Sequence, residues 1–143
     1  MKFAIVVSRY NTEITDGLLA GSIEYLKEKG VEPSLDDIFD APGAFEIPLI
    51  AQSLARTKKY AGVICLGCVI KGDTAHFEFI SLGASMGLMQ ASLATETPIT
   101  FGILTTYTDE QAEIRAKNGA GNKGREAAQA CYESVKVLNR ILT

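Results

Sequence analysis

The sequence lacks the basic surface and the long apolar runs that nucleic-acid-binding and membrane-spanning proteins need. Its 143 residues contain 14 lysines and arginines against 17 aspartates and glutamates, for a formal net charge of −3. Nucleic acid or an anionic membrane is therefore not expected as its main partner. The apolar runs at 3–7 and 63–70 are far too short to cross a bilayer, and Arg9 closely follows the first. Without a targeting signal, the expected location is the cytoplasm.

Cysteine and histidine are also scarce, which limits the metal chemistry open to the chain. There are three cysteines and one histidine. Cys65 and Cys68 form a C-x-x-C pattern, but they lie inside an apolar run typical of a strand, whereas a redox pair opens a helix just past a strand. A zinc site would need two further ligands, and no second pair exists. We therefore expect free core thiols and no metal site.

What the chain does contain is an alternation of predicted strands and helices, with no repeat, linker or low-complexity segment. Its length, with 47% hydrophobic and 22% charged residues, is typical of one globular domain, here residues 1–143. Strands are predicted near 3–8, 35–40, 61–70 and 98–106, and helices over 14–26, 47–55, 74–94, 109–116 and 122–142. The alternation predicts an α/β fold of three layers, α-β-α, around a four-stranded parallel sheet with flavodoxin-like winding.

The predicted helix over 74–94 is apolar on nearly all sides. Small residues rather than charges separate its large apolar side chains, which are Phe77, Phe79, Ile80, Leu82, Met86, Leu88 and Met89. A helix of this kind is normally buried on more than one side. Because a four-stranded sheet cannot bury it alone, we expect a subunit interface here.

Parallel α/β sheets bind ligands at the carboxyl ends of their strands, so the segments after the strands are where a site is expected. These segments are SRYNTE, APGAFE, KGDTAH and TTYTDE. His76, the only histidine, closes the third segment. It suits proton transfer near neutral pH, although a lone histidine is often structural or simply exposed. Backbone N–H groups at the start of the next helix would suit a phosphate.

Three further side chains are open to a functional and to an ordinary interpretation. Arg115 is either a solvated arginine or a residue whose guanidinium group binds a phosphate. Tyr10 is either a rim aromatic or a face on which a flat ring stacks. Glu46 is either a carboxylate favoured at a helix start or an acceptor for a polyol. These residues predict a pocket with a phosphate site, a histidine, an aromatic and a carboxylate, without naming a reaction.

The segment GAGNKG at 119–124 has the spacing of a dinucleotide-binding fingerprint but not its context. It follows a predicted helix rather than a strand, and Lys123 is followed by glycine rather than by the hydroxyl residue of a P-loop. A turn between two helices, capped by Asn122, is the simpler interpretation. Alternatively, Lys123 helps a neighbouring anion site.

Five blocks together resemble the lumazine synthase family, in the right order over nearly the whole chain. They are Arg9-Tyr10-Asn11, PGAFEIP at 42–48, GCVIKGDTAH at 67–76, FGILTT at 101–106 and AGNKG at 120–124. The family condenses 5-amino-6-(D-ribitylamino)uracil with 3,4-dihydroxy-2-butanone 4-phosphate to give 6,7-dimethyl-8-ribityllumazine, phosphate and water. The resemblance therefore implies a transferase of riboflavin biosynthesis that acts on small-molecule substrates and uses no metal or organic cofactor.

The resemblance also implies which residues meet the pyrimidine substrate. Tyr10 would stack on its ring. The ribityl chain would be held by Ala44, Phe45 and Glu46. The edge of the pyrimidine would be contacted, largely through the backbone, by Cys68, Val69 and Ile70. Tyr10 stands where phenylalanine or tryptophan is usual in the family, and stacking survives this change.

At the phosphate end, the resemblance implies a cradle formed by Asp73 and Thr74 together with Arg115. His76 would be the catalytic residue, which moves protons during imine formation and phosphate loss. Lys123, with Glu126 near it, would support the phosphate. Gly119 stands where many relatives have a lysine, which makes this end less basic.

The resemblance further implies a homo-oligomer with a shared site. Phe101 and Arg115 would come from the adjacent subunit, so the site would straddle an interface. The expected assembly is a pentamer. Nothing in the turn at 119–124 obviously prevents twelve pentamers from closing into a shell.

Two other kinds of function remain as alternatives. One is the archaeal type of riboflavin synthase, an enzyme of the same fold; the five blocks fit lumazine synthase better. The other is a non-catalytic pterin- or flavin-binding or shell-forming protein, although His76, Arg115 and Thr74 are all present. A receiver or flavodoxin-like module fits less well, because the first strand is followed by neither an acidic pair nor a Ser/Thr-rich phosphate loop.

Overall fold

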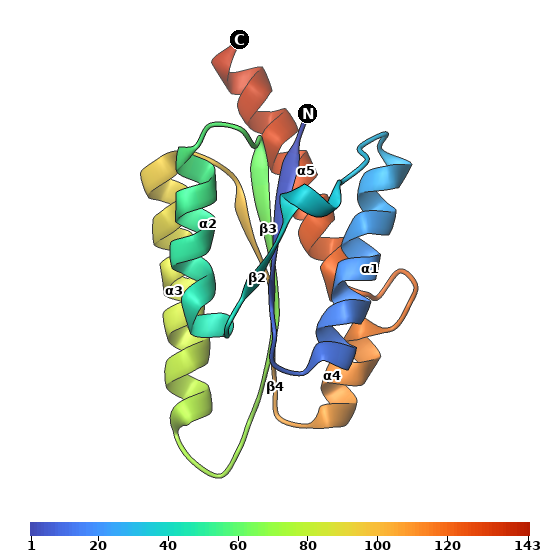
Figure 1. Ribbon diagram of the computed structural model, residues 1–143, viewed down its shortest axis with the longest axis vertical. Helices are drawn as coiled ribbons and strands as arrows, with labels where there is room; N and C mark the ends of the chain where they lie inside the picture. The colour runs from blue at the N-terminus through green and yellow to red at the C-terminus, as the bar shows by residue number, and fades with distance from the viewer.

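A four-stranded parallel sheet forms the middle layer of the molecule (Figure 1). The computed structural model describes residues 1–143. The strands are β1 (Phe3–Ser8), β2 (Ile38–Ala41), β3 (Gly62–Ile70) and β4 (Ile99–Thr106). Their spatial order is β2-β1-β3-β4, and every neighbouring pair is parallel. The predicted fold class, a parallel α/β sheet with flavodoxin-like winding, is confirmed.

Five helices cover the two faces of the sheet, as Figure 1 shows. On one face lie α2 (Ile47–Arg56) and α3 (His76–Thr95), and on the other lie α1 (Thr12–Glu28), α4 (Asp109–Ala116) and α5 (Lys123–Leu142). Two short 3₁₀ helices were not expected from the sequence: η1 (Leu35–Asp37) leads into β2, and η2 (Ala44–Glu46) leads into α2. Pro48 lies in the first turn of α2, where its missing N–H costs nothing.

The central strands are buried on both faces, which explains their unbroken apolar runs. In β1, Phe3, Ile5 and Val7 belong to the core beneath α1 and α5. Ala4 and Val6, between them, belong to the core beneath α2 and α3. Side chains of a strand point alternately to its two faces, so a strand between two helical layers needs apolar residues at every position.

Helix α1 packs unusually closely against the start of α5. A Cβ atom on Gly124 would collide with the backbone carbonyl of Leu18, so only glycine fits there. The hydroxyl of Ser22 donates a hydrogen bond of 2.7 Å to the carbonyl of Gly124 across the same contact. This contact fixes where the turn between α4 and α5 lies relative to the sheet.

Helix α3 is covered on one side only. Ala84, Leu88 and Ala91 are buried against the sheet. Its opposite side exposes large apolar side chains, which are Phe79, Leu82, Met86, Met89 and Leu93. These five residues are called the α3 stripe below. None of the helices combines the length and the apolar character that crossing a membrane requires.

Candidate active site

A pocket of about 420 Å³ opens at the carboxyl ends of the strands. It is formed by the segments that follow β1 and β2, the end of β3 and the beginning of α3. Its lining includes eight of the residues predicted for the site, namely Tyr10, Ala44, Phe45, Glu46, Cys68, Val69, Ile70 and His76. The fold thus gathers segments separated by more than sixty residues of sequence into one place.

The aromatic ring of Tyr10 and the carboxylate of Glu46 both lie close to Gly43. A Cβ atom at Gly43 would lie 2.9 Å from Oε1 of Glu46 and 3.2 Å from the tyrosine ring. Tyr10 is 70% exposed, so its ring face is free to stack on a flat ligand. Glu46 ends η2 and is exposed, so its carboxylate can accept hydrogen bonds from hydroxyl groups.

Asn11, which also lines this pocket, connects the segment after β1 to the end of β3. Its backbone is left-handed, with φ of 58°, a conformation that asparagine tolerates better than most residues. Its side-chain amide donates a hydrogen bond of 3.1 Å to the carbonyl of Cys68. This bond holds the segment that carries Tyr10 against the end of β3. Arg9, beside it in the sequence, instead forms an ion pair with Asp40, next to the end of β2.

The segment between β3 and α3 is exposed and leads directly into a helix N-terminus. Asp73 and Thr74 lie on it, next to the pocket, and α3 begins at His76. The hydroxyl of Thr74 accepts a hydrogen bond of 3.3 Å from the backbone N–H of His76, and Ala75, the N-cap residue of α3, makes no side-chain capping hydrogen bond. A helix start of this kind favours an anionic group.

Two of the predicted site residues lie in a different hollow of the same chain. Phe101 and Arg115 line a depression of about 590 Å³ along the edge strand β4, which Lys123 and Glu126 also line. Nη1 of Arg115 donates a hydrogen bond of 3.0 Å to the carbonyl of Gln111. Nζ of Lys123 lies 2.8 Å from Oε2 of Glu126. Within one chain, therefore, this cationic hollow and the pocket with His76 are separate.

The cysteines are buried, as expected for core thiols. Cys65 and Cys68 both lie in β3, and no bond joins them. Burial raises the pKa of the Cys68 thiol to about 11, and it raises the pKa of the Cys65 thiol well above its ordinary value. Both thiols are therefore neutral near pH 7, and Cys68 contributes an uncharged side chain to the lining of the pocket. No group of three or more His, Cys, Asp or Glu side chains is placed to hold a metal ion.

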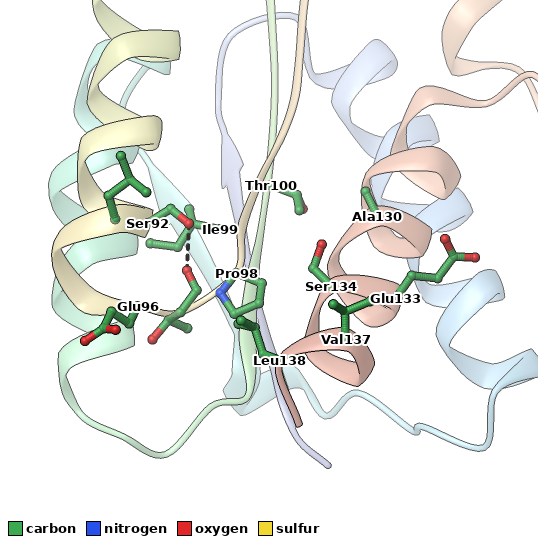
Figure 2. A pocket seen from close by; sticks show the side chains of 12 residues that line it. Ser92, Glu96, Pro98, Ile99, Thr100, Ala130, Glu133, Ser134, Val137 and Leu138 are labelled. Atoms are coloured by element: carbon green, nitrogen blue, oxygen red, sulfur yellow. Dashed lines mark hydrogen bonds between the residues drawn. The ribbon is translucent and has the colours of Figure 1, made fainter. Parts of the chain in front are cut away.

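The largest pocket lies elsewhere and has a different character. It has a volume of about 700 Å³ and lies between α3, α5 and the beginning of β4, at the amino ends of the strands (Figure 2). Its walls carry apolar side chains such as Leu93 and Val137, and its only charged residues are Glu96 and Glu133. No cationic or aromatic side chain lines it, so it lacks the side chains that usually hold a phosphate or stack on a heterocycle.

The pocket at the carboxyl ends has the volume and the mixed polar and apolar lining of a site for a small organic molecule, in a parallel α/β fold typical of enzymes. A comparison with known protein families matches residues 1–139 to 6,7-dimethyl-8-ribityllumazine synthase. The chain belongs to this family, which serves riboflavin biosynthesis.

Curated relatives agree with this assignment. The chain is 64% identical to 6,7-dimethyl-8-ribityllumazine synthase 1 of Caulobacter vibrioides, over 98% of this chain and 92% of the relative. It is 49% identical to 6,7-dimethyl-8-ribityllumazine synthase of Nitratidesulfovibrio vulgaris strain DP4, over 99% of this chain and 90% of the relative. The family resemblance expected from the five sequence blocks is confirmed.

Proposed function

We propose that this chain condenses 5-amino-6-(D-ribitylamino)uracil with 3,4-dihydroxy-2-butanone 4-phosphate to form 6,7-dimethyl-8-ribityllumazine, phosphate and water. Family membership over 1–139 supports this activity. The observation that carries it in the structure is the pocket in which a free aromatic face, a carboxylate and a histidine meet beside a helix N-terminus. The named relatives are all synthases of this lumazine, which favours this activity over riboflavin synthase and over a non-catalytic binding protein.

The pyrimidine substrate occupies the pocket at the carboxyl ends. Its ring stacks on Tyr10, whose ring face is exposed. Its ribityl hydroxyls donate to Glu46, beside Ala44 and Phe45 of η2. The uracil edge meets Cys68, Val69 and Ile70, where β3 ends.

The second substrate brings its phosphate to the segment between β3 and α3. Backbone N–H groups at the start of α3, with Asp73 and Thr74, form one side of the cradle. His76, at the first position of α3, takes up and returns protons as the amine attacks the ketone and water leaves. It then assists loss of the phosphate group, after which the ribitylamino nitrogen attacks the remaining carbonyl and the ring closes with loss of a second water.

Arg115 and Phe101 complete this site from a neighbouring subunit. They line a hollow that is separate from the His76 pocket within the chain, so a second copy is needed to bring the two half-sites together. The α3 stripe supports the same arrangement. Its members recur at spacings of three and four residues, the spacing by which helices of identical chains pack along a common seam. The proposed assembly is a pentamer of one-domain chains in the cytoplasm, and twelve pentamers could close into a shell.

The activity is tested by mixing purified protein with both proposed substrates and following the fluorescence of the lumazine product. We expect product to form well above the uncatalysed rate, with release of one phosphate per lumazine. Omission of either substrate is the control. Absence of any acceleration would overturn the proposed function.

Catalysis should not depend on added metal. The proposed steps need only side chains and backbone groups of the chain. We expect the same turnover before and after exhaustive dialysis against a chelator, measured with the fluorescence assay. Activity that disappears on dialysis and returns with a divalent cation would contradict this prediction.

The active form should be an oligomer. We expect light scattering to give a mass of about five times the 15.4 kDa chain, or a larger multiple of it if shells form. Met86→Glu places a charge in the α3 stripe and should reduce both the mass and the activity. A stable monomer with full activity would refute the shared site.

A further inference from the structure

Asn122 is almost completely buried in the turn between α4 and α5, and all of its polar atoms are hydrogen-bonded. The residue is 2% exposed. Its amide nitrogen lies 3.0 Å from each of three backbone carbonyls, those of Gly17 in α1, Ala116 and Lys117. Its amide oxygen accepts a hydrogen bond of 3.0 Å from the backbone N–H of Arg125. The reverse orientation would set oxygen against three carbonyls, so the network leaves only one orientation for the amide.

This one side chain forms hydrogen bonds with backbone groups at the ends of two helices. Its oxygen caps the first turn of α5, in the usual manner of an asparagine N-cap. Its nitrogen satisfies the carbonyls of Ala116 and Lys117 at the end of α4, where carbonyls have no partner within the helix. An ordinary N-cap performs only the first of these tasks. The second ties the end of α4 to α5 and, through Gly17, to α1.

The two helix ends joined in this way carry the cations of the hollow along β4. Arg115 directly precedes Ala116, and Lys123 directly follows Asn122. Between them, residues 117–121 are all exposed, and no atom packs beside Gly119 or Gly121. The geometry of the two cations relative to each other therefore depends on Asn122 more than on any other side chain of the turn.

We infer that Asn122 is a positioning residue for the phosphate-bearing substrate, because it fixes, relative to each other, the two helix ends that carry Arg115 and Lys123, and these two cations line the same hollow. The inference rests on the proposed function, in which these cations face that group. It also explains the GAGNKG segment: the glycines permit the turn and the close approach to α1, and the asparagine locks the turn in place.

The test is Asn122→Ser in the full-length assembled enzyme. Serine still caps α5, but its shorter side chain has a single hydroxyl hydrogen and cannot replace the two N–H donors with which the amide reaches the carbonyls of α4. We expect KM for the butanone phosphate to rise about tenfold or more, since small displacements of anchoring groups have large effects. KM for the pyrimidine should change less than about twofold, because that pocket does not contact the turn. The inhibition constant of inorganic phosphate should rise together with KM for the phosphate substrate. Asn122→Thr, which caps in the same manner and fills more of the site, is the second variant.

Ser22→Ala is the matched control. It removes a buried hydrogen bond from the same contact between α1 and α5 but touches nothing in α4. It should lower the thermal stability and leave both KM values unchanged. If the Asn122 variants raise both KM values equally, or lower only the stability, Asn122 is merely structural and the inference is overturned while the proposed function stands. A wild-type enzyme that forms no product would overturn both.

Discussion

Replacing Arg115 with alanine should lower kcat/KM more than replacing His76. Arg115 would form charge-assisted, bidentate hydrogen bonds with a phosphate in a site closed by the neighbouring subunit. Loss of such an anchor costs about 2–5 kcal/mol, or roughly 30-fold to several-thousand-fold in kcat/KM. The same loss removes the alignment of the two substrates, which is a large contribution in a condensation.

His76 contributes through proton transfer, which is typically worth about 10²–10⁴-fold. We expect the lower end of this range, because water is itself a product of the condensation and can take over part of the proton transfer. Steady-state kinetics on Arg115→Ala and His76→Ala decide the ranking. The control is Arg140→Ala, which removes an exposed arginine from the last turn of α5 and should leave kcat/KM unchanged. A greater loss in His76→Ala would show that proton transfer, rather than positioning, dominates.

The largest effect on folding is expected for Gly124→Ala. The added methyl group would collide with the backbone carbonyl of Leu18, which cannot move without shifting α1. Overpacking a core side chain typically costs about 1–3 kcal/mol, and a clash with backbone should exceed that range. We expect a much lower midpoint of thermal unfolding, or loss of soluble protein.

Gly121→Ala is the matched control for this variant, because it lies in the same turn with no atom within 4 Å of its added Cβ. It should change the free energy of unfolding by less than about 0.5 kcal/mol. Both variants are compared at one protein concentration, because association shifts apparent stability. Equal stability of the two would show that α1 does not approach α5 as closely as described.

The strands and helices could be predicted well because their apolar patterns are local. The strand at 3–8 and the helix at 109–116 have the predicted boundaries, and the other helices and β3 and β4 differ by one or two residues. The first strand is the clearest, since its continuous apolar run over residues 3–7 leaves few other structures. The region of β2 was less well predicted. It begins at Ile38 rather than near residue 35, because Ser34 accepts a hydrogen bond from Asp36 and starts a 3₁₀ turn first.

The geometry around the site could be predicted only in part. The sequence indicated which segments reach the carboxyl ends, and eight predicted residues do line one pocket. It did not reveal the bond from Asn11 to Cys68, which joins residues 57 positions apart. Nor could local pattern separate the hollow of Arg115 from the pocket of His76, since their separation depends on the order of strands in the sheet. The role of Asn122 was predicted as a simple cap, and the three carbonyls it contacts became apparent only in the fold.

The two chain termini lie together at the end of the molecule opposite the candidate site (Figure 1). Met1 and Leu142 line the same surface hollow, at the amino ends of the strands. A fluorescent domain, an affinity tag or a passenger peptide fused to either terminus would therefore extend away from the substrate pocket. The same proximity makes the chain a suitable frame for circular permutation, with a short linker between the old ends and new ends in an exposed turn.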